Sequence, residues 1–334
     1  MMDNIIREDL ENIKKTVKGD VFSGKKILVT GGAGFIGSWI CDLLVDFSAQ
    51  VTVIDDLSTG RIKNIDHLIK RSLLNFIQVD VCAFRSDEKF DFIFHMAGHA
   101  SPDEYQTYPI ETLQTSATGT FIMTELARKN DAPLLFSSTS EVYGDTSIIP
   151  TPENYWGNVN PIGPRSCYDE GKRFAEALLM AYRQQYGLDV RVPRIFNSYG
   201  PRLREDGLYG RALSRFIAQA LANQSITVYG DGKQTRSFCY IADTVTGLLL
   251  LATTPEASGE VVNVGNVHEV TILELAQRIK EITKSQANIT FHPLPKDDPK
   301  RRCPDTVKLE KIVNWKPNFG LQEGLQKTIE WFTK

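Results

Sequence analysis

The chain has 334 residues, of which 42% are hydrophobic and 24% charged, the composition of an ordinary soluble globular protein. A formal net charge of −3 gives no overall positive field, which argues against nucleic acid and membrane surfaces as partners. The five cysteines stand singly and the five histidines form no cluster, so we expect no disulfide framework and no metal site. Scattered single cysteines are typical of a reducing compartment, and we therefore expect a cytoplasmic protein.

Residues 1–24 are predicted to form an N-terminal extension. Within it Ile5, Ile6, Leu10 and Ile13 recur at helical spacing, which indicates an amphipathic helix that docks on another part of the molecule. The segment is charged throughout and lacks the apolar core of a signal peptide. The longest apolar run of the chain, near residue 250, is too short to span a bilayer.

Short apolar runs rich in β-branched and aromatic residues alternate with helix-like segments through the first half of the chain. This alternation predicts an α/β fold with a doubly wound parallel sheet of the Rossmann type. We place the larger, Rossmann-type domain at 25–197, with later segments near 236–265 returning to it, and a smaller α/β domain, expected to bind the substrate, at 198–334. Buried strands are expected at 25–32, 50–56, 75–80, 90–97 and 132–139, and helices at about 35–47, 108–130 and 165–186.

A glycine-rich turn directly follows the first predicted strand and opens a helix. In "VTGGAGFIGSWI", Gly31, Gly34 and Gly37 fit G-x-x-G-x-x-G, a variant of the dinucleotide fingerprint. Glycine permits the tight turn and the close approach of the pyrophosphate, and the helix N-terminus supplies unpaired N–H groups. We therefore expect NAD to bind against these glycines and the first helical residues, Phe35 and Ile36.

Acidic residues end the second and third predicted strands. Asp55 can accept hydrogen bonds from the adenosine ribose and repel a 2′-phosphate, which favours NAD, although Arg61 nearby keeps NADP as a minor alternative. Asp80, followed by Val81, is placed to reach the adenine. Turn chemistry at a strand end is the other explanation for both carboxylates.

Tyr168 and Lys172 are four residues apart, so both project from one face of the long predicted helix. A nearby ammonium favours the phenolate and is expected to lower the pKa of Tyr168. The phenolate can then take a proton from a substrate hydroxyl near neutral pH, while Lys172 binds the nicotinamide ribose. This spacing also occurs by chance on exposed helices, but behind a dinucleotide fingerprint it indicates a catalytic pair.

The two motifs together resemble those of the extended short-chain dehydrogenase/reductase family. From about Lys25 to the C-terminus, "STSEVYGD", "YWGNVNPIGPRSCYDEGKR", "RIFNSYGPR", "VYGDGKQTRSFCYIAD" and "DDPKRRCPD" are similar to UDP-glucuronate decarboxylases, also called UDP-xylose synthases. The resemblance implies that NAD takes a hydride from C4 of UDP-glucuronate while Tyr168 takes the hydroxyl proton. The 4-keto acid would then lose carbon dioxide, and return of the hydride would give UDP-xylose.

The same resemblance assigns roles around the reacting carbons. Thr139 would hydrogen-bond the C4 oxygen, Glu141 would handle a proton or water near C5, and Arg302 would meet the substrate carboxylate. Related 4,6-dehydratases carry Asp-Glu after the threonine, and Ser140 replaces that aspartate here, which argues against dehydration.

For the UDP half, the resemblance places Asn197 and Arg236 at the diphosphate and nucleotide, where the planar guanidinium can donate two hydrogen bonds to phosphate. Tyr229 would pack near the uridine or serve as a core aromatic. The family commonly dimerises through paired helices, which here would be 106–130 and 165–187 in a four-helix bundle.

Three positions depart from the family pattern and keep alternatives open. Gly98 and His99 replace a serine and a proline, and Ser116 replaces an asparagine. UDP-glucuronate 4-epimerase is the main alternative, followed by a 4,6-dehydratase. A non-catalytic NAD-binding sensor is the alternative from another class, but such a protein has no need of the phenol of Tyr168.

Overall fold

The computed structural model describes residues 3–204 and 211–334, and its main feature is a large parallel sheet. The strand order is β3-β2-β1-β4-β5-β7-β12, with β6 paired to β7. The order reverses between β1 and β4, which creates a crevice at the carboxyl ends of the strands. The strands are β1 (Lys26–Thr30), β2 (Gln50–Asp55), β3 (Leu74–Gln78), β4 (Phe92–His95), β5 (Leu134–Phe136), β6 (Ser138–Thr139), β7 (Val190–Ile195) and β12 (Val261–Val264).

Burial on both faces explains why these runs form central strands. Four of the five residues of β1 and all four of β4 are buried, and Ile27 pairs with both Val51 and Phe92 in parallel register. The predicted strand at 132–139 is divided into β5, which pairs with both β4 and β7, and β6, which pairs with β7. The Rossmann-type prediction is confirmed.

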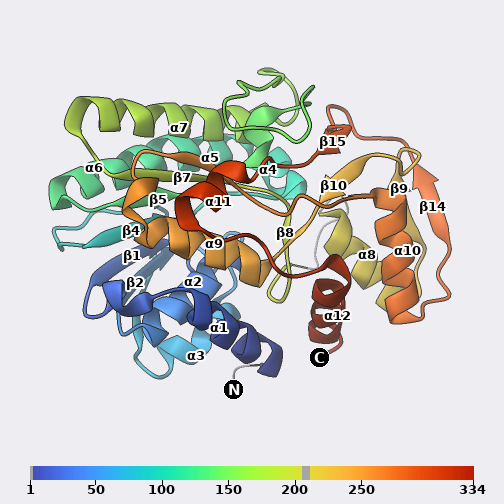
Figure 1. The fold of residues 1–334 in the computed structure, drawn as a ribbon, viewed down its shortest axis with the longest axis horizontal. Coiled ribbons are helices and arrows are strands. Elements are labelled where there is room, and N and C mark those ends of the chain that lie inside the picture. The colour runs from blue at the N-terminus through green and yellow to red at the C-terminus, as the bar shows by residue number, and fades with distance from the viewer. Residues whose placement is uncertain (1–2, 205–210) are drawn as a thin grey trace.

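Helices cover both faces of this sheet (Figure 1). The helix predicted at 108–130 begins at Pro109, and a π-helical turn at Thr115–Gly119 divides it into two α-helices. One face carries α4 (Pro102–Thr107), α5 (Pro109–Gln114), α6 (Thr120–Asn130) and α7 (Ser166–Tyr186), and the other carries α1 (Asn4–Thr16), α2 (Phe35–Asp46), α3 (Asp66–Ile69), α9 (Ile241–Thr253) and α11 (Val307–Val313).

The N-terminal helix is an integral part of the second layer. Leu10 and Ile13 are buried in the main core, where α1 packs against α2 and α9. Asp9 accepts hydrogen bonds from the Tyr240 hydroxyl at 2.6 Å and from Lys327 Nζ at 2.8 Å. The predicted docking of an amphipathic helix is therefore confirmed, and its target is the chain itself.

The chain from Ser198 onward builds smaller sheets at one end of the large one (Figure 1). They are β13-β10-β15, β11-β8 and β14-β9. From this part of the chain, α9 packs against the large sheet and β12 pairs with β7 within it. The domain boundaries at 24 and 197 remain predictions. The remaining elements are β8 (Ser198–Tyr199), α8 (Ala212–Leu221), β9 (Ile226–Tyr229), β10 (Thr235–Ser237), β11 (Cys239–Tyr240), β13 (Glu269–Thr271), α10 (Ile272–Thr283), β14 (Ile289–His292), β15 (Arg301–Arg302), α12 (Leu321–Phe332) and 3₁₀ turns at Gly19–Phe22, Ile62–Asn64, Ser140–Tyr143 and Pro255–Ala257.

Across the described ranges, no helix combines the length and apolar character needed to cross a bilayer. The same residues contain no group of three or more histidine, cysteine or acidic side chains arranged to hold a metal ion. All five cysteines carry free thiols.

Candidate active site

A cavity of about 520 Å³ lies where the carboxyl ends of the central strands meet the smaller sheets. Every residue that the sequence predicted for the site lines this one cavity. These residues are Gly31, Gly34, Phe35, Ile36, Gly37, Asp55, Asp80, Val81, Thr139, Glu141, Tyr168, Lys172, Asn197, Tyr229, Arg236 and Arg302.

The glycine turn is shaped for a close-lying ligand. Gly31 has a φ of +66°, and a Cβ there would lie 2.8 Å from the backbone of Ala97. A Cβ on Gly37 would lie 2.3 Å from the carbonyl oxygen of Gly31. Gly34 precedes α2 without a side-chain cap, so the N–H groups of the first helical turn are available to an anion. These residues fit the pyrophosphate of a dinucleotide.

Both strand-end carboxylates take part in turns. Asp55 accepts hydrogen bonds from the amides of Ala33 and Leu57, each at 2.9 Å, and burial raises its pKa. Asp80 accepts from the amide of Cys82 at 2.8 Å. A carboxylate has further lone pairs for a ribose or an adenine, so the turn role and the cofactor role are compatible.

The expected lowering of the Tyr168 pKa is wrong for this structure. Burial raises the pKa of Tyr168 to about 12, although a hydrogen bond with Thr139 opposes the shift. The Lys172 ammonium lies 6.0 Å from the Tyr168 ring centre and donates instead to the carbonyl of Ser137 at 2.8 Å. Burial also lowers the pKa of Lys172 to about 8. Burial of the two side chains therefore has a larger effect on their pKa values than their proximity on α7.

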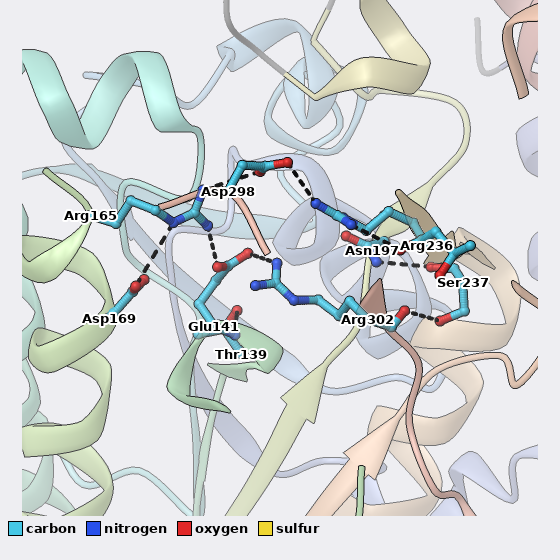
Figure 2. Close-up of polar contacts among 10 residues, drawn as sticks. Thr139, Glu141, Arg165, Asp169, Asn197, Arg236, Ser237, Asp298 and Arg302 are labelled. Carbon is cyan, nitrogen blue, oxygen red and sulfur yellow. Dashed lines mark hydrogen bonds and ion pairs between the residues drawn. The ribbon is translucent and has the colours of Figure 1, made fainter. Parts of the chain in front are cut away.

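Glu141 lies between two arginines (Figure 2). Its carboxylate forms ion pairs with Arg165 and Arg302. Burial acts to raise the pKa of Glu141, but the two positive charges and their hydrogen bonds lower it to about 2. Glu141 is thus ionised at neutral pH, so it can orient a group or accept a proton but has none of its own to donate.

The predicted substrate residues form a second polar group, which Figure 2 also shows. Arg236 donates to Asp298 at 2.9 Å, and Arg165 Nη1 lies 3.9 Å from the same carboxylate. The side-chain amide of Asn197 donates to the carbonyl of Ser237 at 2.9 Å. Two guanidinium groups that share a carboxylate are arranged to hold an anion.

Tyr229 is half-buried on β9 at the cavity wall. The guanidinium of Arg215 lies 4.8 Å from its ring centre, which is the geometry of a cation–π contact. A place near a uridine remains a prediction for this ring.

Among the cavity residues that the sequence did not predict, Arg165, Asp298 and Arg211 act most directly on the predicted site residues. Arg165 could have been found from its position three residues before Tyr168, at the start of the catalytic helix. Asp298 stands in a charged run that is usually solvent-exposed, and nothing in the sequence around Arg211 singles it out. Arg211 lies close enough to Tyr168 to act on its pKa.

Two of the three departures from the family pattern, His99 and Ser116, have local structural explanations. His99 is buried, with its ring nitrogens 3.2 Å from the hydroxyl of Thr112 and 3.4 Å from that of Ser58. A Cβ on Gly171 would lie 3.0 Å from the Cβ of Ser116, so a small residue at 116 suits the close approach of α7.

A sequence model of the NAD dependent epimerase/dehydratase family matches residues 27–265, more than half of the chain. The chain belongs to this family. It is 48% identical over 310 residues to UDP-glucuronic acid decarboxylase 1 of Danio rerio, a match that covers 93% of this chain and 73% of that protein.

Solved structures of similar proteins have the same overall fold. The UDP-glucose 4-epimerase of Thermotoga maritima is 30% identical with a TM-score of 0.84, covering 92% of this chain and 98% of that one. A UDP-glucuronic acid 4-epimerase mutant of Bacillus cereus, in complex with a fluorinated UDP-glucuronic acid and NAD, is 28% identical with a TM-score of 0.83, covering 92% and 99%. NAD is the cofactor of the present chain, in agreement with its glycine turn.

Proposed function

We propose that this protein is a UDP-glucuronate decarboxylase that produces UDP-xylose. The observation that carries the proposal is its 45–48% identity, over more than nine-tenths of its length, to curated UDP-glucuronic acid decarboxylases from animals and plants. The cavity supports it, because Thr139, Tyr168 and Lys172 lie together with two arginines suited to a sugar carboxylate.

The reaction needs oxidation before carbon loss. Bound NAD would accept a hydride from C4 of the sugar and later return it. A ketone at C4 is β to the carboxylate, so it can take up the electron pair of the breaking C5–C6 bond. Tyr168 would take the O4 proton and give it back, with the hydroxyl of Thr139 beside it. Lys172 and Arg211 are cations close enough to favour its phenolate during that step.

The substrate carboxylate would be held by Arg302 and Arg165. One terminal nitrogen of Arg302, Nη2, is buried and bonds to no other group in the part of the chain that the structure describes. A buried guanidinium nitrogen gains much from a charged acceptor. Arg236 and Asn197 lie further along the cavity and would bind the diphosphate, where a phosphate would replace the carboxylate of Asp298 beside Arg236.

We also propose a homodimer formed through α5, α6 and α7. Their outer surface exposes large apolar side chains, with Ile110 66%, Phe121 48% and Phe174 51% exposed. Phe121 and Tyr186 both contact the ring of Tyr182, so this apolar surface continues from α6 to α7. A contiguous exposed apolar surface on helices is typical of an interface. A cytoplasmic location is part of the same proposal, because free thiols suit a reducing compartment.

The decisive test incubates purified protein with UDP-glucuronate and no added NAD, followed by mass spectrometry and proton NMR of the sugar nucleotide. We expect loss of the carboxyl carbon as carbon dioxide and a xylose-type spectrum. UDP-glucose is the control, because it has no carboxylate to lose. An unchanged mass with inverted C4 would make the protein a 4-epimerase and direct attention to Gly98 and His99. No turnover even with NAD supplied would contradict both activities.

A further inference from the structure

The segment that carries Thr139 is held against α7 at successive turns of that helix. Tyr168 shares a hydrogen bond with Thr139. One turn further along, the Lys172 ammonium donates to the carbonyl of Ser137 at 2.8 Å. Residues four apart lie on one face of a helix, so the next side chain on this face is that of Glu176.

Glu176 makes a third contact with the same segment. Its carboxylate accepts a hydrogen bond from the hydroxyl of Ser138 at 2.5 Å, and the two residues are only 8% and 3% exposed. A carboxylate has no hydrogen to give, so the hydroxyl of Ser138 must donate. The contact therefore fixes the orientation of the side chain that directly precedes Thr139.

Arg194 holds the carboxylate of Glu176 from the other side. Its Nε and Nη2 donate to the two carboxylate oxygens at 3.0 and 2.7 Å, which is a bidentate pair of defined geometry. Arg194 stands opposite Ser138 in the register of β6 with β7, and its Nη1 donates to the carbonyl of Glu153 at 3.0 Å. Glu176 thus joins α7, β6 and β7 in one buried cluster.

The shortness of β6 makes such a contact important. The strand is only two residues long, and among the described strands it pairs with β7 alone. Thr139 is its last residue, and the 3₁₀ turn at Ser140–Tyr143 follows at once. Two register pairs constrain the chain here much less than they would inside a longer strand. A fixed side chain at Ser138 constrains the backbone one residue away from the reacting group.

We propose that Glu176 is a positioning residue that acts on Thr139 through Ser138. The inference rests on the proposed function, in which the hydroxyl of Thr139 lies beside Tyr168 while the O4 proton is transferred. Small displacements of groups around the reacting atoms slow the chemical step strongly. Glu176 itself does not line the cavity, so its loss should affect hydride transfer more than the binding of UDP or the retention of NAD.

The test mixes full-length protein and its retained NAD with UDP-glucuronate and follows the absorbance of NADH as it forms. We expect Ser138→Ala and Glu176→Ala each to slow NADH formation by at least about tenfold. NAD released on denaturation, and the affinity for UDP by titration calorimetry, should stay within about twofold of the wild type. With UDP-glucuronate deuterated at C4, the isotope effect on turnover should rise in both variants, because hydride transfer has become the slow step.

The double variant separates positioning from general damage to the fold. If Glu176 acts through Ser138, the double variant should form NADH no more slowly than Glu176→Ala, because the second change removes a hydrogen bond that is already lost. Effects of the two changes that multiply would show that the residues act independently, and would overturn the proposal.

Glu170→Ala and Ser147→Ala are the matched controls, since they make the same changes at a 37% exposed side chain of α7 and at an exposed residue, both outside the cavity lining. Both should form NADH at the wild-type rate. If Glu176→Ala does not fold, Ser138→Ala decides by itself, and a rate within about twofold of the wild type overturns the proposal. Failure of the wild type to form NADH or release carbon dioxide from UDP-glucuronate would instead contradict the proposed function.

Discussion

At the residue scale, the surroundings of Tyr168, Lys172 and Glu141 shift the pKa of each side chain from its ordinary value. Burial disfavours charge on Tyr168 and Lys172, whereas two arginines hold Glu141 ionised despite its burial. A phenol whose pKa is high returns a proton readily, and the positive charge of Arg211 opposes the rise, which favours the step in which Tyr168 accepts one. The pKa of Tyr168 is raised and those of Lys172 and Glu141 are lowered within one cavity, which is typical of an acid–base site.

Replacing the phenol tests the catalytic assignment. Tyr168→Phe removes the only hydroxyl of that side chain, and we expect turnover of UDP-glucuronate to fall by about 10²–10⁴. Retained NAD should stay at the wild-type level, as measured by release on denaturation. Activity within about tenfold of the wild type would exclude Tyr168 as the proton acceptor. A pure NAD-binding sensor would show no turnover in either form.

At the element scale, α2 and α7 contribute different kinds of groups to the site. The N-terminus of α2 presents backbone N–H groups, so its requirement is for small residues and not for a particular side chain. By contrast, α7 presents Tyr168 and Lys172 in little more than one turn, and packs closely because Gly171 meets Ser116. A helix fixes such side chains more firmly than a loop does.

Substitution of a single glycine should separate cofactor retention from folding. In Gly37→Ala the new Cβ would lie 2.3 Å from the carbonyl oxygen of Gly31, so the turn must shift. We expect loss of copurified NAD and a destabilisation of about 1–3 kcal/mol in urea unfolding. Gly320→Ala, whose Cβ would meet nothing within 4 Å, is the control. Full NAD content in the Gly37 variant would contradict the role of the glycine turn in binding NAD.

At the scale of the whole molecule, His95 joins the sheet to its helical cover. Its Nδ1 lies 2.8 Å from the hydroxyl of Thr30 on β1, and its Nε2 lies 3.1 Å from that of Thr120 on α6. Burial lowers the pKa of His95 to about 3, with a further contribution from Lys172. The folded protein therefore holds the His95 ring in its neutral form.

Acid should weaken the fold through this ring. The unfolded chain binds the His95 proton below about pH 6.5, whereas the folded chain resists it down to about pH 3, so stability is lost as the pH falls between those values. The contribution to the slope is at most about 1.4 kcal/mol per pH unit. Urea unfolding of wild type and His95→Gln at several pH values measures it, and equal slopes would show that the ring does not titrate as described.

The proposed dimer can be tested on the same scale. Phe174→Glu places a charge on the outer surface of α7, and we expect a monomer by light scattering after gel filtration. Phe291→Glu, at a 56% exposed position on β14, should leave the assembly unchanged. A wild-type protein that is itself monomeric would refute the proposal, and a dimer in both variants would place the interface elsewhere.

The local sequence pattern was enough to predict the main structural elements of the fold. The parallel strands, the docked N-terminal helix and the glycine turn depend on residues close in the sequence, because periodicity and backbone conformation are short-range properties. The motifs around Gly31 and Tyr168 can therefore be located from the sequence alone. The π-helical turn at Thr115–Gly119 was missed, since it interrupts a run of helical character.

The tertiary structure alone decided the charges of the site. Glu141 meets Arg302 across 161 positions of the chain, and no local pattern predicts that pairing. The pKa of Tyr168 was predicted in the wrong direction, because the helix shows that Lys172 is near but does not show how deeply both are buried. Desolvation depends on everything that surrounds a group, and those neighbours come together only when the whole chain has folded.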